Sequence, residues 1–270
     1  MNPIAFSFGF VEIRWYAVLI LTGFLIGIYL ITREAKRQNM NINMILDLCF
    51  YLVIVSIIGA RIYYVIFEFD QYKDNLIEIF KIWNGGLAIH GGIISGIVFT
   101  YFYTKKRNIN ILKITDIIVP SLALGQSIGR WGNFFNSEAY GSITTLKTLK
   151  KLHIPQFIID GMHIKVHGVY HYFHPTFLYE SLWCLICFVI LMIIRRNKKI
   201  KIGQITGTYF ILYGVERFFI ESLRQDSLMF LNLKVAQLIS IIMLLLGIIL
   251  IIYSIKKSKN YNWCINCIGD

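Results

Sequence analysis

Long uninterrupted apolar runs dominate the chain. Each is close in length to the roughly 20 helical residues that cross a bilayer core of about 30 Å. Their apolar positions are continuous rather than alternating, which favours helices over half-buried strands. Seven runs follow one another, at residues 13–31, 45–67, 87–103, 114–129, 177–194, 203–222 and 235–255. The pattern therefore predicts an all-α integral membrane protein with about seven transmembrane helices.

Lysine and arginine clusters predict the orientation of these helices. Dense basic clusters follow the first, third, fifth and seventh runs, whereas an acidic stretch at 68–78 follows the second. Basic loops tend to stay on the cytoplasmic side of a membrane. The N-terminus is therefore predicted outside and the C-terminus in the cytoplasm. We expect a single transmembrane domain over residues 1–255, with an outer polar segment at 130–175 and a basic cytoplasmic tail at 256–270.

Composition supports a lipid environment. The 270 residues are 56% hydrophobic and 16% charged, whereas soluble domains are about 25% charged. The formal net charge of +12 sits in short clusters between apolar runs, so nucleic-acid binding is not expected. Cys264 and Cys267 form a lone Cys-x-x-Cys pair, and a structural zinc site needs about four ligands. No metal site is predicted.

Polar and ionisable residues gather at the predicted outer ends of several helices. Charged groups at membrane depth are costly and tend to mark functional sites. The candidates are Arg14, Tyr16, Arg61, His90, Arg130, Asn133, Asn136, Glu138, Glu180, Arg217, Glu221 and Arg224. Separate helices would thus bring their ionisable groups to one depth, although Glu180 could instead satisfy a neighbouring helix.

Three of these positions also have a purely structural interpretation. Arg61 could reach the membrane interface or pair with Glu68. Arg217 and Glu221 are four residues apart on one predicted helix, so they could form only a structural ion pair. His90 could be a satisfied buried histidine, although the glycines beside it allow close backbone approach to a ligand.

The segment at residues 129–141 is the most informative one. It combines Arg130, two asparagines, Glu138 and three glycines directly after the fourth run. This composition is typical of an ordered, re-entrant polar turn that faces a cavity. An arginine there suits a phosphate group, which a guanidinium binds through two parallel hydrogen bonds. At this depth the available phosphate is a phospholipid headgroup.

Motifs along most of the chain resemble one known family. The segment Gly129-Arg130-x-Gly-Asn133-Phe134-x-Asn136-x-Glu138-x-x-Gly141 resembles the signature of the bacterial prolipoprotein diacylglyceryl transferases. The supporting matches are Arg14-Trp15-Tyr16, the glycine-flanked His90, Asp116 before Pro120, His174-Pro175-Thr176-x-Leu178-Tyr179-Glu180, and Tyr213-Gly214-x-x-Arg217-Phe218-x-x-Glu221-x-x-Arg224. The seventh run carries no such motif.

The resemblance implies a transferase of the bacterial cell membrane whose active site faces outward. Its members move diacylglyceryl from phosphatidylglycerol to the lipobox cysteine of a prolipoprotein, the first step of lipoprotein maturation. A thioether forms and glycerol 1-phosphate is released. Residues 1–255 would then be the catalytic domain, and no metal or nucleotide motif indicates a cofactor.

The reaction suggests roles for the candidate residues. Arg130 and Arg217 would stabilise the leaving phosphate, because fixed positive groups placed where negative charge develops lower a barrier. His90 would act as the base that takes the thiol proton, since the thiolate is the reactive form of cysteine. Tyr16 would hold substrate from the first helix. The other candidates would bind substrate or orient the arginines: Asn133, Asn136, Glu138, Gly141, Glu221 and Arg224.

A transporter or channel for an anionic solute is the alternative from another functional class. It would explain arginines within a helical bundle equally well. A conduction path, however, requires polar residues along the depth of several helices. The cytoplasmic halves of the second to seventh predicted helices are nearly free of charge, which favours the transferase.

Overall fold

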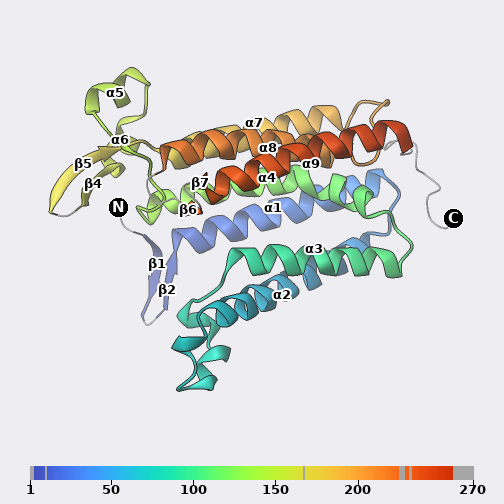
Figure 1. The fold of residues 1–270 in the computed structure, drawn as a ribbon, viewed down its shortest axis with the longest axis horizontal. Helices are drawn as coiled ribbons and strands as arrows, with labels where there is room; N and C mark the ends of the chain where they lie inside the picture. Colours follow the sequence, from blue (N-terminus) through green and yellow to red (C-terminus); the bar gives the residue numbers. More distant parts are fainter. Residues whose placement is uncertain (1–2, 10, 167, 225–228, 231–232, 258–270) are drawn as a thin grey trace. The chain divides into compact units, whose positions relative to one another are not determined.

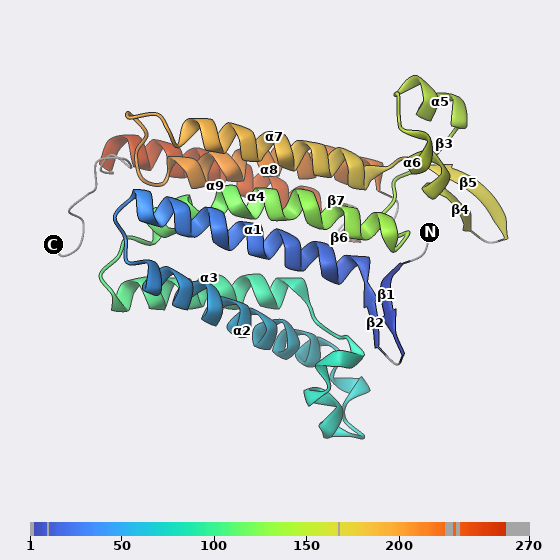
Figure 2. The same ribbon diagram turned by 180° about the vertical axis from the view of Figure 1, so that it is seen from behind.

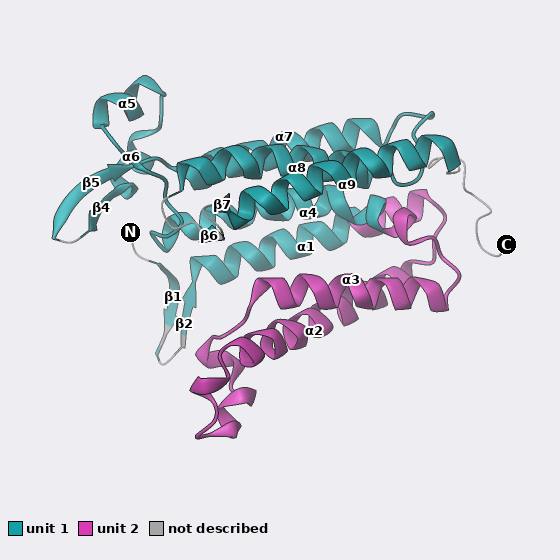
Figure 3. Cartoon of the chain, in the orientation of Figure 1, with its two compact units in different colours: residues 1–30, 115–264 teal, residues 31–114, 265–270 magenta. Residues whose placement is uncertain are grey.

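The computed structural model describes residues 3–9, 11–166, 168–224, 229–230 and 233–257. Long helices form most of this part of the chain (Figures 1 and 2). They are α1 (Trp15–Arg37), α2 (Ile42–Phe67), α3 (Ile89–Lys106), α4 (Ile111–Phe135), α7 (Thr176–Ile194), α8 (Gln204–Leu223) and α9 (Val235–Lys257). The chain divides into two compact units, residues 1–30 with 115–264 (unit 1) and 31–114 with 265–270 (unit 2) (Figure 3).

Each predicted apolar run coincides with one of these long helices. Five of them are long and apolar enough to cross a membrane, namely α1, α2, α4, α7 and α9. The other two are less apolar over their length, because α3 has only 18 residues and ends in two lysines, and α8 contains Glu216, Arg217 and Glu221. Five candidate spans are therefore found among the described residues, and the count of seven stays a prediction.

Short strands and helices precede or connect the long helices, and the all-α expectation omitted the strands. The strands are β1 (Ile4–Phe8), β2 (Val11–Arg14), β3 (Ile143–Thr144), β4 (His163–Val166), β5 (Val169–Phe173), β6 (Met229–Phe230) and β7 (Leu233–Lys234). β1 pairs with β2, β6 with β7, and the third sheet has the order β3-β5-β4. The short helices α5 (Leu146–Lys151) and α6 (Gln156–Gly161) belong to the predicted outer polar segment.

Small residues allow the helices of unit 1 to pack closely. Between α4 and α7, the Ser127 hydroxyl donates to the Ser181 carbonyl at 2.8 Å, and the Ser181 hydroxyl donates to the Ser127 carbonyl at 2.9 Å. Between α8 and α9, a Cβ atom at Gly207 would lie 2.9 Å from the Gly247 carbonyl. Interfaces of small residues and interhelical hydrogen bonds are typical of helices packed within a membrane.

One end of unit 1 is fixed by Asp116 of α4, which caps the start of α8. The Asp116 carboxyl group accepts hydrogen bonds from the amides of Gly203 at 2.6 Å and Thr206 at 2.8 Å. It also accepts one from the Thr206 hydroxyl at 2.5 Å. The first amides of a helix have no partner within the helix, so a buried acid placed there satisfies them. Asp116 therefore has a structural role in this fold.

The other end of unit 1 has an aromatic core that corrects one prediction. The fourth helix was expected to end near Gly129 and to be followed by a re-entrant turn, but α4 continues to Phe135. Phe134 stacks on Phe177 of α7, with ring centroids 4.6 Å apart, and Trp131 meets Phe177 edge-on at 5.4 Å. These contacts bury Phe134 and pack the last turns of α4 against α7, so the helix persists in spite of its glycines.

Unit 2 contains α2 and α3, which run antiparallel and in close contact. A Cβ atom at Gly59 of α2 would lie 2.9 Å from the Gly91 carbonyl of α3. At the opposite end of the pair, the Tyr103 hydroxyl donates to the Met44 carbonyl at 2.8 Å. Three short 3-10 turns join the helices: η1 (Phe69–Gln71), η2 (Leu76–Phe80) and η3 (Ile82–Asn84). Many large apolar side chains of both helices remain exposed, as expected of surfaces that face lipid.

Candidate active site

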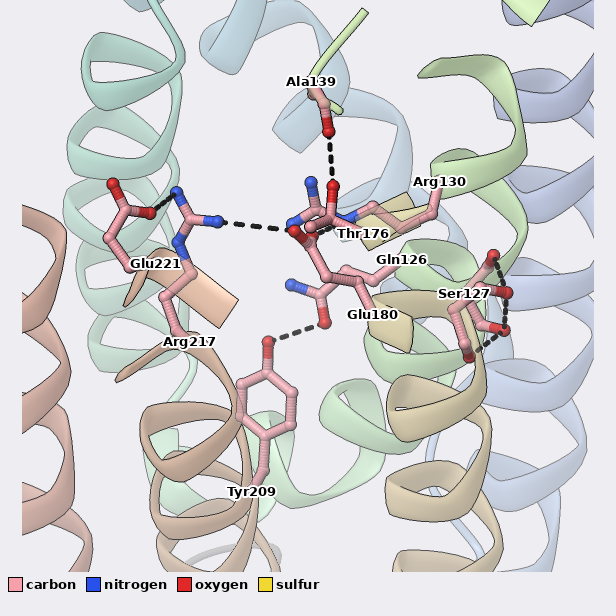
Figure 4. Close-up of polar contacts among 10 residues, drawn as sticks. Gln126, Ser127, Arg130, Ala139, Thr176, Glu180, Tyr209, Arg217 and Glu221 are labelled. Carbon is pink, nitrogen blue, oxygen red and sulfur yellow. Dashed lines mark hydrogen bonds and ion pairs between the residues drawn. The ribbon is translucent and has the colours of Figure 1, made fainter. Parts of the chain in front are cut away.

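Two arginines from different helices of unit 1 converge on one glutamate. Glu180, in the second turn of α7, is buried, with a side chain only 1% exposed. One oxygen of its carboxylate lies 2.5 Å from Nε of Arg130, near the end of α4. The other lies 3.6 Å from Nη1 of Arg217 on α8. Figure 4 shows the carboxylate between the two guanidinium groups. The sequence placed Glu180 among the polar residues at the helix ends but assigned it no role in the reaction, whereas the structure places it at the centre of the cluster.

Arg217 is held from its other side by Glu221. Its Nη2 lies 2.9 Å from a Glu221 carboxylate oxygen, one helical turn further along α8. The predicted i, i+4 ion pair is thus confirmed. Because Arg217 also reaches Glu180, the pair belongs to a chain of four charged side chains, Arg130–Glu180–Arg217–Glu221 (Figure 4). We call these four residues the arginine cluster.

A further acid lies beside the cluster without a direct partner. Glu216 of α8 is 3% exposed and interacts electrostatically with Arg130, Arg217 and Glu180. Among the described residues, neither of its carboxyl oxygens has a hydrogen-bond partner. A buried carboxyl group without partners is costly. No sequence pattern singled out Glu216, since a glutamate next to an arginine at a helix end is usually solvated.

A lysine that was not predicted closes the end of α8. The Lys234 ammonium group donates to the backbone carbonyls of Glu221 at 2.6 Å and Arg224 at 2.9 Å. These contacts tie the start of α9 to the end of α8, because an ammonium group satisfies carbonyls left open at a helix C-terminus. Arg224 also forms an isolated β-bridge with Gly141. Two predicted binding residues, Arg224 and Gly141, are therefore neighbours.

Tyr16 lies against the end of α4 that carries Arg130. A Cβ atom at Gly132 would lie 3.2 Å from Cε2 of the Tyr16 ring and closer still to another ring atom. Glycine therefore permits the ring to rest on the helix backbone between Arg130 and Asn133. The neighbouring Trp15 ring stacks on Phe135 with centroids 5.1 Å apart. The start of α1 thus brings Tyr16 beside the end of α4.

The turn after α4 is held in an unusual backbone conformation. Ser137 and Ala139 have φ values of 53° and 54°, in the left-handed region that side-chain-bearing residues seldom adopt. The Thr176 hydroxyl donates to the Ala139 carbonyl at 2.6 Å, and the Gly141 amide donates to the His174 carbonyl at 2.9 Å. Backbone strain of this kind tends to collect at functional sites.

Three predicted binding residues lie in or beside this turn. The Asn136 amide group donates to the Glu138 carboxylate at 3.1 Å, and the Glu138 backbone amide donates to the Asn133 carbonyl at 3.0 Å. The side-chain carbonyl oxygen of Asn136 is buried and has no partner among the described residues. It is therefore available to a hydroxyl donor.

His90 belongs to unit 2, in the first turn of α3. Its side chain is exposed, and its ring lies 6.3 Å from the Tyr63 ring of α2. The joint action of His90 with the arginine cluster of unit 1 stays a prediction.

Comparison with known proteins identifies the family. The family model described as prolipoprotein diacylglyceryl transferase matches residues 3–253. The chain belongs to this family. It is also 48% identical over 261 residues to a Streptococcus suis protein, which covers 96% of this chain and 94% of the relative. Over 262 residues it is 47% identical to a Streptococcus pneumoniae protein, covering 97% of both, and 45% identical to a Listeria innocua protein, covering 97% and 93%.

The three relatives carry the name phosphatidylglycerol–prolipoprotein diacylglyceryl transferase. The names support the transferase and not the alternative of an anion transporter. The family resemblance drawn from the sequence motifs is confirmed. Among this family's expected site residues, Arg130, Arg217 and Glu221 meet in one cluster of unit 1, and Tyr16 lies near Arg130.

Proposed function

We propose that this membrane transferase moves the diacylglyceryl group of phosphatidylglycerol to the lipobox cysteine of a prolipoprotein. The cysteine sulfur attacks the glyceryl carbon, and a C–S bond forms. The bond between that carbon and the phosphate oxygen breaks, and its electron pair leaves with glycerol 1-phosphate. Three relatives of that name, which are 45% to 48% identical over nearly the whole chain, support this reaction.

The convergence of Arg130 and Arg217 on one carboxylate carries the proposal. Each guanidinium already holds an anionic group in a buried place, and a phosphate has the same charge and acceptor geometry. The phosphate of phosphatidylglycerol would therefore compete with Glu180 for the two arginines. As the phosphodiester becomes a monoester its negative charge grows, so the arginines stabilise the transition state more than the bound substrate.

The remaining site residues take supporting roles. His90 accepts the thiol proton. Asn133 and Asn136 orient the glycerol hydroxyls, and the unpartnered side-chain oxygen of Asn136 supports this role. Tyr16 contacts substrate from α1. The other members of the proposed binding set are Glu138, Gly141, Glu221 and Arg224, of which Glu221 holds Arg217 directly.

We also propose how the enzyme lies in the bacterial cell membrane. Seven helices cross it, with α3 and α8 completing the five apolar ones. The N-terminus and the arginine cluster face outward, where prolipoproteins emerge, and the C-terminus is cytoplasmic. Residues 1–255 form the catalytic domain and 256–270 the basic tail. Cys264 and Cys267 lie outside the described residues.

Mass spectrometry tests the reaction directly. Membranes containing the enzyme are given phosphatidylglycerol and a lipobox peptide, and the peptide mass should increase by one diacylglyceryl group. A peptide whose cysteine is replaced by serine is the matched substrate control and should stay unmodified. An unmodified cysteine peptide, or equal transfer from phosphatidylethanolamine, would contradict the proposed donor.

A further inference from the structure

The connection between α2 and α3 carries exposed apolar side chains that no helix packing explains. We call residues 69–84 the η segment, since it contains η1, η2 and η3. Within this segment, Phe80 is 77% exposed, Trp83 is 76% exposed and Ile77 is 68% exposed. Exposed apolar patches of this kind mark interaction sites. The sequence pattern had suggested only an acidic outer loop.

The η segment is ordered because Arg61 of α2 binds its backbone. Arg61 is buried, and its guanidinium group donates to the carbonyls of Glu78 at 2.7 Å and Ile79 at 2.8 Å. It also donates to the carbonyls of Gly85 at 2.8 Å and Gly86 at 2.9 Å. Of the two structural interpretations considered for Arg61, the pairing with Glu68 is not found among the described residues, where its guanidinium binds backbone carbonyls instead. Its hydrogen bonds satisfy backbone carbonyls that water would otherwise have to reach.

The charges of the η segment are neutralised within the segment. Lys73 pairs with Asp70 at 3.3 Å, and Lys81 pairs with Glu78. The hydrogen bond from Lys81 lowers the pKa of Glu78, so this carboxylate stays ionised. With Asp74 included, three acids face two lysines between residues 69 and 84. An anionic surface would therefore not attract the segment, and its apolar side chains must drive any association.

A lipid surface is the partner that fits these features. The exposed patch continues along α2, one of the apolar candidate spans, whose last residues Ile66 and Phe67 are exposed too. Tryptophan and other aromatic residues are enriched where a membrane protein meets the headgroup layer. A backbone whose carbonyls are satisfied internally tolerates that layer well.

We propose that the η segment is an interfacial anchor: Ile77, Phe80 and Trp83 insert between lipid headgroups and acyl chains and thereby set the depth of His90. The connection to His90 is short and rigid. Arg61 fixes Gly85 and Gly86, and the Ala88 amide donates to the Ala60 carbonyl at 3.1 Å. His90 follows two residues later, at the start of α3. The role of the depth of His90 in diacylglyceryl transfer rests on the proposed function. The insertion of the η segment into lipid does not depend on it.

Fluorescence quenching in vesicles tests the insertion. The full chain, with Cys264 and Cys267 changed to serine, receives a single environment-sensitive probe at Phe80→Cys or Trp83→Cys. Lys73→Cys, in the same segment but paired with Asp70, is the matched control. Phosphatidylcholine vesicles carry nitroxide lipids, and the parent chain corrects for labelling of the native cysteines. We expect lipid nitroxides to quench probes 80 and 83, aqueous iodide to quench probe 73, and added phosphatidylglycerol or salt to change neither.

A second probe tests the effect on His90. A probe at His90→Cys should move to a different depth when Ile77, Phe80 and Trp83 are replaced by serine. Trp83→Ser alone, with helix content checked by circular dichroism, guards against misfolding of the triple variant.

Iodide quenching of probes 80 and 83 would overturn the anchor, as would a shift of these probes only upon peptide addition. An unchanged depth at position 90 would overturn its control of His90. Absence of transferase activity in the unmodified chain would refute the proposed function alone.

Discussion

The arginine cluster of unit 1 and Arg61 of unit 2 show two ways in which one residue type is used. In the described part of the chain, the hydrogen bonds of the Arg61 side chain go to four backbone carbonyls, all within 2.9 Å. Arg130 and Arg217 instead contact carboxylates. All three arginines lie near a helix end rich in candidate site residues, so their positions alone do not separate them.

The difference lies in what the partner allows. A backbone carbonyl is neutral and fixed by the chain, so an arginine that binds several of them organises a fold. A carboxylate is an anion on a side chain, and a substrate anion of similar shape can take its place. A substrate phosphate would therefore meet Arg130 and Arg217 already desolvated and oriented, which reduces the cost of binding.

The largest expected effect follows from removing Arg130. Arg130→Gln should reduce the transfer rate by about 10²–10³-fold, the usual loss when one directed electrostatic contact to a transition state is removed. The fold should persist, because Glu180 keeps Arg217 as a partner. Initial rates with phosphatidylglycerol and a lipobox peptide measure the change. Arg33→Gln, an exposed arginine of α1, is the control and should retain its rate; an unchanged rate in Arg130→Gln would remove Arg130 from the site.

Replacing Arg61 should reduce the stability of the fold, whereas replacing Arg130 should mainly reduce the transfer rate. Arg61→Met leaves the four backbone carbonyls without their guanidinium donor, at about 1–3 kcal/mol for each group that water cannot reach. The thermal unfolding midpoint in detergent should fall clearly below that of the unmodified chain, and further than the midpoint of Arg130→Met. Arg61→Lys should not restore it, because one ammonium group cannot span carbonyls arranged for a planar guanidinium. Equal midpoints for Arg61→Met and Arg130→Met would erase the distinction between the two kinds of arginine.

A smaller effect should follow from changing the carboxylate that the phosphate replaces. Glu180→Gln removes the competing negative charge, so glycerol 1-phosphate should inhibit about tenfold more strongly, equivalent to about 1.4 kcal/mol. Turnover should fall as well, because two arginines lose their common partner. The inhibition constant of the product measures the first effect and the maximal rate the second.

Glu216→Gln is the matched control for that experiment. It replaces a buried carboxyl group in the same region, but Glu216 forms no hydrogen bond among the described residues. Product inhibition should strengthen less than in Glu180→Gln, with little loss of turnover. Weaker inhibition in Glu180→Gln than in the unmodified enzyme would show that Glu180 assists anion binding rather than competing with it.

The helices and part of the site could be predicted from the sequence. The length and continuity of the apolar runs place every long helix, and the spacing of Arg217 and Glu221 allows their pairing. The extension of α4 could not be predicted, because Gly132 usually weakens a helix while the stacking of Phe134 on Phe177 depends on another helix.

The central position of Glu180 could not be predicted for a related reason. Its two partners lie 50 and 37 residues away in the chain, on helices whose rotation is decided by packing. Local patterns show that a residue is polar and at which depth of a span it lies. They do not show which side chains from other helices it will meet. Glu180 differs from Glu216 in this respect, because Glu180 contacts two arginines and Glu216 forms no hydrogen bond among the described residues.

The smallest expected effect concerns His174 of unit 1. Like Arg61, and unlike the arginine cluster, His174 should affect folding stability rather than binding of the product. Its carbonyl holds the Gly141 amide, and its Nδ1 lies 3.2 Å from the Tyr179 hydroxyl. Burial lowers the pKa of His174 from its ordinary value of 6.5. The unfolded chain therefore binds a proton below about pH 6.5 where the folded chain resists it, so folding stability should decrease as pH falls through that range. Thermal unfolding at pH 5 and pH 7 measures this, and His174→Gln should lessen the difference between the two midpoints while leaving inhibition by glycerol 1-phosphate unchanged. A pH dependence that is unaltered in His174→Gln would assign the acid sensitivity to another group.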